Sequence, residues 1–230
     1  MEILFGETGL LFARWIHFFA GIIWIGHLYY FNFVQGAFFG EIDANTKNIV
    51  VTKLVPKALW WFRWGAAATW LSGFYIIMGR AHFTGWEIFA TSWGINILIG
   101  SLLGTVMFLN VWLIIWPNQK VVIQSATQVL GGGQALAEAA AAGARAGLAS
   151  RHNTLFSIPM LLFMGMASHF GYEVMAASLV PLWVTVFAIV GALEFNAIKG
   201  KMGPLASIKG VIHCGFGLAI ALFLVVRFLA

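Results

Sequence analysis

Charged residues are scarce in this chain of 230 residues, which has 13 Lys and Arg, 8 Asp and Glu, and a charged fraction of 9%. A soluble globular domain carries roughly 25% charged residues, and so few charges cannot form its polar surface. The composition therefore excludes a soluble enzyme, a nucleic-acid-binding domain and a disordered linker. The net charge of +5 is expected to reflect membrane topology rather than binding to polyanions.

Cysteine is almost absent, because Cys214 is the only one in the sequence. This excludes a disulfide framework, a cysteine-rich zinc site and an iron–sulfur cluster held by this chain alone. There is also no C-x-x-C-H sequence, so c-type haem cannot be attached to these residues.

Apolar residues make up 61% of the sequence and gather in six windows of about membrane-spanning length. Each window is expected to be a helix, because backbone amides in hydrocarbon must be hydrogen-bonded within their own segment. The sequence thus predicts an all-α fold, a single integral membrane domain over residues 1–230 with six transmembrane helices. The windows are roughly 8–34, 59–79, 93–116, 153–170, 174–196 and 208–229.

Basic residues alternate between the two sides of these six spans. Ten fall between spans one and two, three and four, and five and six, on one side, and only Arg14, Arg80 and Arg227 fall on the other. By the positive-inside rule the ten mark the cytoplasmic side, so both termini are expected to be non-cytoplasmic. The ten are Lys47, Lys53, Lys57, Arg63, Lys120, Arg145, Arg151, Lys199, Lys201 and Lys209.

One connection is long, about residues 117–151, and it is expected to be a cytoplasmic loop with short helices. Trp116-Pro117 is expected to end the third span, because the residue before proline is steered away from helix. Apolar residues then recur at helical spacing up to Leu130, and an Ala-rich stretch over 134–150 predicts a second short helix.

Six histidines stand out in a chain so poor in polar groups. Ionisable residues at membrane depth are costly and usually face the bundle interior or a cavity. At about 1.5 Å per residue, the six sort into an outer and an inner level. The outer level has His17, His82 and His169, and the inner level has His27, His152 and His213.

Two facing imidazoles at one depth can ligate a haem iron. The simplest pairs are His17 with His169 and His27 with His213, which predicts one or two b-type haems, with copper or non-haem iron as the alternative. Arg14 lies one helical turn from His17 and could pair with a haem propionate. The candidate cofactor-binding residues are His17, His27, His152, His169, His213 and Arg14.

Three other polar residues lie within the spans. Glu194, near the inner end of the fifth span, is expected to pair with a nearby lysine, or to relay protons. Asn32 and Asn110 are expected to hydrogen-bond neighbouring helices.

Several stretches resemble the membrane domain of the bacterial cytochrome c-type urate oxidases (urate hydroxylases). Residues 16–26 read I-H-F-F-A-G-I-I-W-I-G, similar to the His-x6-Trp-Ile-Gly first helix of that family. Similar blocks follow at 104–111, at 116–120 (W-P-N-Q-K) and at 151–154 (R-H-N-T), with His169 seventeen residues after His152. The resemblance runs from about residue 10 to 200.

This resemblance implies a membrane-embedded oxidoreductase that oxidises urate and passes electrons to a cytochrome c, and it favours His17, His152 and His169 as site residues. Two features depart from the family. The sequence has no cytochrome c domain, so the electron acceptor would be a separate protein. The fifth span also reads A-L-E-F-N at 192–196, where the family has a histidine.

Three functions therefore remain open. The first is a membrane oxidoreductase or electron-transfer protein with b-type haem, acting on urate or a related small molecule. The second is an accessory subunit of a larger respiratory or photosynthetic membrane complex, and the third is a small transporter. The expected location is the bacterial inner membrane, in contact with the lipid bilayer and with either a cytochrome c or a multi-subunit complex, and without nucleic acid.

Overall fold

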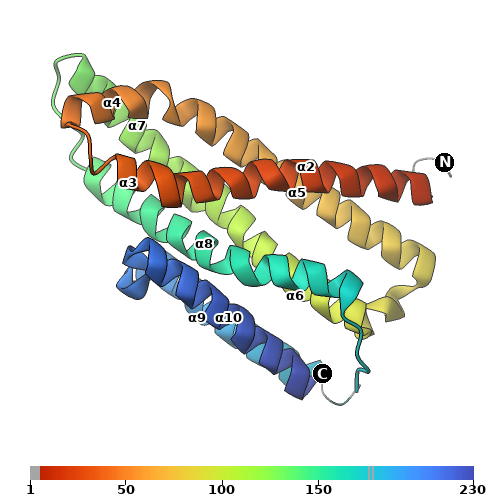
Figure 1. Ribbon diagram of the computed structural model, residues 1–230. Helices are drawn as coiled ribbons and strands as arrows, with labels where there is room; N and C mark the ends of the chain where they lie inside the picture. The colour runs from red at the N-terminus through yellow and green to blue at the C-terminus, as the bar shows by residue number, and fades with distance from the viewer. Residues whose placement is uncertain (1–5, 176, 178) are drawn as a thin grey trace.

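A computed structural model describes residues 6–175, 177 and 179–230, and every regular element in them is a helix (Figure 1). This confirms the predicted all-α class. The long helices are α2 (Glu7–Tyr29), α5 (Val55–Thr84), α6 (Ser92–Leu109), α7 (Trp116–Leu130), α8 (Ala139–His169), α9 (Leu179–Lys199) and α10 (Ile208–Leu229). The short ones are η1 (Tyr30–Gln35), α3 (Gly36–Phe38), α4 (Ala44–Lys53), η2 (Trp86–Ala90), η3 (Asn110–Ile115) and η5 (Gly203–Ala206).

Four helical runs are long and apolar enough to cross a membrane: Glu7–Phe38, Ser92–Leu130, Leu179–Lys199 and Ile208–Leu229. The predicted second and fourth spans correspond to α5 and α8, which have 30 and 31 residues. Their sequences are less apolar than those of the four runs above. The predicted fifth window, 174–196, includes residues 176 and 178, which lie outside the described residues, and α9 begins after them.

The bundle is built around α8. This helix packs against α6, α7 and η3 on one side and against α9 and α10 on another, while α2 pairs mainly with α5. In Figure 1, α8 lies between α2 and the α9–α10 hairpin, and α2 begins at the same end of the bundle at which α10 ends. The buried core therefore runs along α8, between helices that are far apart in sequence.

The structure differs from the prediction in the long connection after the third span. Helix α6 continues through η3 into α7 as one run of 39 residues, and the Ala-rich stretch is the first half of α8 instead of a separate short helix. Pro117 lies in the first turn of α7, where a missing backbone N–H is tolerated. The preceding π-helix, η3, already widens the turn there.

Candidate functional site

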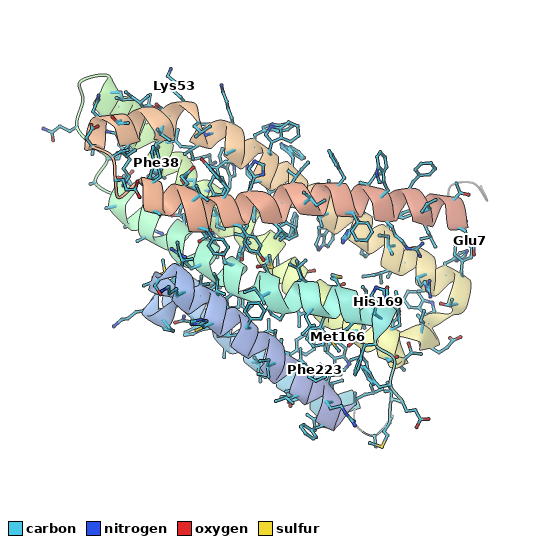
Figure 2. All side chains as sticks on the ribbon, viewed as in Figure 1. Glu7, Phe38, Lys53, Met166, His169 and Phe223 are labelled. Carbon is cyan, nitrogen blue, oxygen red and sulfur yellow. The ribbon has the colours of Figure 1, made fainter. Side chains whose placement is uncertain are left out.

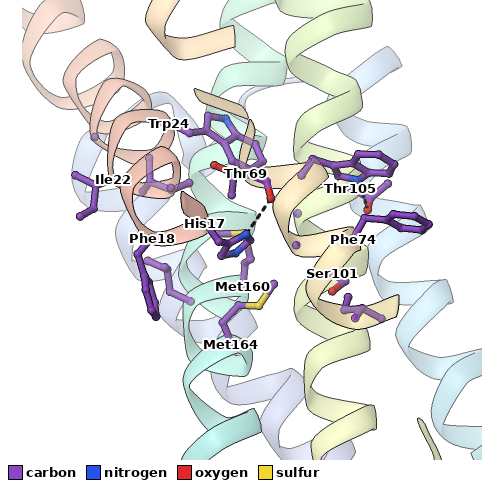
Figure 3. A pocket seen from close by; sticks show the side chains of 18 residues that line it. His17, Phe18, Ile22, Trp24, Thr69, Phe74, Ser101, Thr105, Met160 and Met164 are labelled. Atoms are coloured by element: carbon purple, nitrogen blue, oxygen red, sulfur yellow. Dashed lines mark hydrogen bonds between the residues drawn. The ribbon is translucent and has the colours of Figure 1, made fainter. Parts of the chain in front are cut away.

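A cavity of about 480 Å³ lies between α2, α5, α6 and α8 (Figure 3). Its lining is overwhelmingly apolar. Phe18 and Ile22 of α2 line the cavity and are also 70% and 74% exposed on the bundle surface. The cavity therefore reaches the outer, lipid-facing side of α2.

His17 is the one histidine that lines this cavity. Its Nδ1 lies 2.9 Å from the backbone oxygen of Thr69 and 3.2 Å from Oγ of Ser72, both on α5. A carbonyl oxygen can only accept, so Nδ1 carries the proton and donates it, which leaves the lone pair on Nε2. Among the described residues no group hydrogen-bonds to Nε2. The ring is thus fixed in the tautomer that metal-binding histidines use.

Glycine makes room for the ring on α5. A Cβ at Gly73 would lie 2.9 Å from Cε1 and 3.3 Å from Nδ1 of His17, so any larger residue would displace the imidazole. Gly21 and Gly104 also line the cavity. Small residues on three helices therefore leave the space beside His17 open.

Trp24 lies on the same face of α2 as His17, two helical turns further along, and also lines the cavity. Its side chain is only 2% exposed, and Nε1 has no hydrogen-bond partner among the described residues. A buried donor without an acceptor costs about 1–3 kcal/mol.

The wall formed by α6 and α8 supplies hydroxyl and sulfur atoms. Thr105 accepts a hydrogen bond from Nε1 of Trp70 at 3.1 Å, and Ser101 lies one turn away on α6. Met160 and Met164 line the cavity from α8 (Figure 3). With Trp70 of α5 and His17 of α2, groups that can donate hydrogen bonds or ligate a metal are thus present on all four walls.

The structure does not bring His27 and His213 together. His27 is half-buried on α2 and donates from Nδ1 to the backbone oxygen of Ile23, one turn earlier, at 2.7 Å. His213 is exposed on α10. In the described part of the chain α2 and α10 share no extended contact, and α8 lies between them. Two histidines that are predicted at the same depth in the membrane therefore do not face each other in the bundle.

His169, the predicted partner of His17, is the last residue of α8, is exposed, and is not part of the cavity lining (Figure 2). Arg14 is half-buried one turn from His17 toward the start of α2. Among the described residues no three His, Cys, Asp or Glu side chains cluster as ligands for a metal ion. The structure thus assigns only His17 of the predicted residues to the cavity lining.

His152 is fully buried, but both of its ring nitrogens have partners inside the protein. Nδ1 donates to the backbone oxygen of Leu148 at 2.9 Å, and Nε2 accepts from Nδ2 of Asn196 on α9, also at 2.9 Å. This arrangement ties α8 to α9. It uses the lone pair that a metal would need.

A buried polar cluster joins η3, α8 and α9 near His152. Nδ2 of Asn110 donates to Oδ1 of Asn153 and to Oε2 of Glu194, each at 3.0 Å, and Nδ2 of Asn153 donates to the backbone oxygen of Met107 at 2.9 Å. Glu194 thus accepts from an asparagine, where the sequence suggested a lysine. The expected hydrogen bonding of Asn110 and Asn32 across helices is confirmed, since Asn32 donates to Ser150 at 2.8 Å.

Comparison with known proteins gives one match. A sequence model of a family described as urate oxidase N-terminal matches residues 80–220, more than half of the chain. No curated protein and no solved structure matches. The matched region contains α6, α8 and the buried cluster around Asn153, and it excludes His17, which lies in the stretch that resembles the first helix of the same family. The chain therefore belongs to the urate oxidase N-terminal family and is a urate-oxidase-like membrane protein.

Proposed function

We propose that this protein is a membrane-embedded oxidoreductase or electron-transfer protein that holds a b-type haem in the cavity beside His17. The observation that carries the proposal is the environment of that one imidazole. Its Nδ1–H is held by the backbone oxygen of Thr69, and Nε2 is left with a free lone pair next to an apolar cavity of about 480 Å³.

The size of the cavity favours a large cofactor over a bare metal ion. Cofactor sites are mostly apolar and have volumes of roughly 300–1,000 Å³, whereas an ion needs only ligand atoms at about 2.0–2.3 Å. Copper or non-haem iron bound by the same imidazole is the alternative.

The residues around the cavity fit a haem in three respects. His17 would supply a nitrogen ligand from Nε2, and its hydrogen bond from Nδ1 to Thr69 fixes the orientation of the ring. Gly73 leaves room for the ring, and Arg14, one turn away, would pair with a propionate. Haem bound there would supply one-electron transfer, while the protein supplies the ligand, the apolar surroundings and the fixed ring orientation.

Family membership suggests what the electrons would come from. The proposed reductant is urate or a related small molecule, and the proposed acceptor is a cytochrome c. In this proposal α2, α5, the α6–α7 run, α8, α9 and α10 span a bacterial inner membrane. The start of α2 and the end of α10 lie at one end of the bundle, which supports placing both termini on one side. The basic residues of the alternate connections support placing that side outside the cytoplasm.

The test is haem content per chain in protein purified in detergent, measured by absorption after extraction. The wild type and His213→Ala, which removes an exposed histidine of α10, are expected to carry about one haem per chain. The haem content of His17→Ala is expected to be at least about tenfold lower. Mutation of a group that only orients a metal ligand already lowers metal affinity about 10–100-fold, and loss of the ligand itself should cost at least as much. Wild-type protein without haem, or equal haem in His17→Ala, would overturn the proposal.

The substrate is tested separately. Membranes that contain the wild-type protein are expected to reduce added ferric cytochrome c when urate is supplied, and membranes with His17→Ala are not. Haem binding without urate-dependent reduction would leave an electron-transfer protein with a different donor.

A further inference from the structure

Two methionines on α8 share the cavity with His17. Met160 and Met164 are four residues apart and so lie on the same face of α8, and both line the cavity that His17 lines from α2. Met160 is 7% exposed and Met164 is half-buried. Figure 3 shows both side chains on the α8 wall of the cavity, with His17 on the α2 wall.

The sulfur atoms lie against a glycine pair on α6. A Cβ at Gly104 would lie 3.5 Å from Sδ of Met160, and a Cβ at Gly100 would lie 3.3 Å from Sδ of Met164. The G-x-x-x-G spacing of α6 thus accommodates two thioethers at close range. Methionine often fills gaps in apolar cores, but here the two side chains border about 480 Å³ that they leave unfilled.

We propose that the metal bound by His17 takes its second protein ligand from a thioether of α8, either Met160 or Met164. This inference rests on the proposed metal cofactor and replaces the earlier expectation that His169 would be the partner, since His169 is exposed and does not line the cavity.

Thioether sulfur suits the metals under consideration. Methionine paired with histidine ligates haem iron in electron-transfer cytochromes, where it raises the reduction potential relative to two histidines, and it is a preferred ligand of Cu(I). A raised potential would favour acceptance of electrons from an organic donor. The thioether assignment therefore applies to haem and to copper alike.

The experiment compares wild type with Met160→Leu, Met164→Leu, the double variant, and Met166→Leu as the matched control. Met166 is buried on the same helix and does not line the cavity, and a Met to Leu change conserves volume. The readouts are haem and copper per chain, the red-region charge-transfer band of thioether-ligated ferric haem, and the midpoint potential.

The wild type and Met166→Leu are expected to show this band. In the haem that it retains, the double variant is expected to lack this band and to have a lower midpoint potential than the wild type. One of the two single variants is expected to reproduce the change. A double variant with unchanged band and potential, in protein whose haem depends on His17, would overturn the thioether assignment and leave the proposed haem site intact.

Metal analysis separates the remaining outcomes. Wild-type protein that contains copper in place of haem, with the copper lost in the double variant, would overturn the proposed haem and support the thioether ligand. Wild-type protein with neither haem nor copper would overturn both the proposed cofactor and the proposed thioether ligand.

Discussion

Substitution of Gly73 by alanine tests the geometry around His17 with a single added methyl group. That carbon would lie 2.9 Å from Cε1 of His17, whereas ordinary contacts begin at about 3.4 Å. The ring must therefore move by about 0.5 Å, because the glycine backbone on α5 is held within a long helix. The movement strains the bond from Nδ1 to Thr69, which is 2.9 Å long.

Two opposing effects set the size of the change. Alanine in place of glycine within a helix stabilises it by about 0.5–1 kcal/mol. The clash of the added methyl group with the imidazole costs about 1–3 kcal/mol, and weakening of the His17 hydrogen bond costs up to about 1 kcal/mol more. We expect Gly73→Ala to lower the free energy of unfolding by roughly 1–2 kcal/mol.

The control is Gly165→Ala on α8, where an added Cβ meets no atom within 4 Å. There the helix preference acts alone, so stability is expected to rise by about 0.5–1 kcal/mol. The assay is denaturant unfolding in detergent followed by circular dichroism, together with the haem spectrum of each variant. If Gly73→Ala were as stabilising as Gly165→Ala and had an unchanged spectrum, the described placement of His17 would be refuted.

Three further predictions concern groups outside the cavity. Asn153→Ala should lower the free energy of unfolding by about 1–3 kcal/mol, because it removes the buried donor to the Met107 carbonyl and one of the two acceptors of Asn110. The control Thr185→Val changes a half-buried residue whose hydroxyl donates only within its own helix, and it should stay within about 0.5 kcal/mol. Equal effects of the two substitutions would contradict the buried cluster. Asp43 begins α4, and hydrogen bonds from the Thr46 side chain and from the backbone amides of Thr46 and Asn45 lower the pKa of its carboxyl. The ionised Asp43 carboxyl therefore stabilises α4 at pH values above about 3.9, the pKa of an aspartate in the unfolded chain. This stabilisation is lost as the pH falls through the lower pKa that the carboxyl has in the folded protein. Asp43→Asn keeps a capping oxygen but cannot titrate, so it should remove the pH dependence of α4 stability, measured by amide hydrogen exchange. An acid transition of α4 that persists in the variant would contradict the role of the Asp43 cap. Burial raises the pKa of Tyr172, in the α8–α9 connection, to about 12, while its hydroxyl donates to Asn96. Its contribution to stability should be complete below about pH 10 and lost as the pH rises through about 12. A phenolate difference titration of wild type against Tyr172→Phe measures this, and a midpoint near the ordinary value would contradict it.

The fold class could be predicted from the sequence because hydrocarbon admits few backbone conformations. Each of the six apolar windows contains a long helix, and only the helix ends differ. Pro117 illustrates the limit, because it was expected to end a helix and instead lies in the first turn of α7, directly after η3. A π-helix has no clear signature in hydropathy, so the continuous run from α6 to α7 could not be foreseen.

The candidate site could be predicted in part. His17 was identifiable because an ionisable residue deep in an apolar segment is expensive. The residues that share the cavity with His17 cannot be identified in the same way, because Met160 and Met164 do not differ in hydropathy from other apolar residues of the helix. The pairing of His27 with His213 relied on depth alone, and depth does not tell which helices pack together. Glu194 bonds to Asn110 across 84 residues of sequence, and no local pattern predicts such a contact.

The central claim, a metal at Nε2 of His17, is tested most directly by anomalous difference maps of the crystallised protein. Data collected on either side of the iron and copper absorption edges would locate each element. We expect a single iron peak within ligand distance of Nε2, inside the cavity between α2, α5, α6 and α8. A map with no peak there, or with metal only at the exposed His169 or His213, would contradict it.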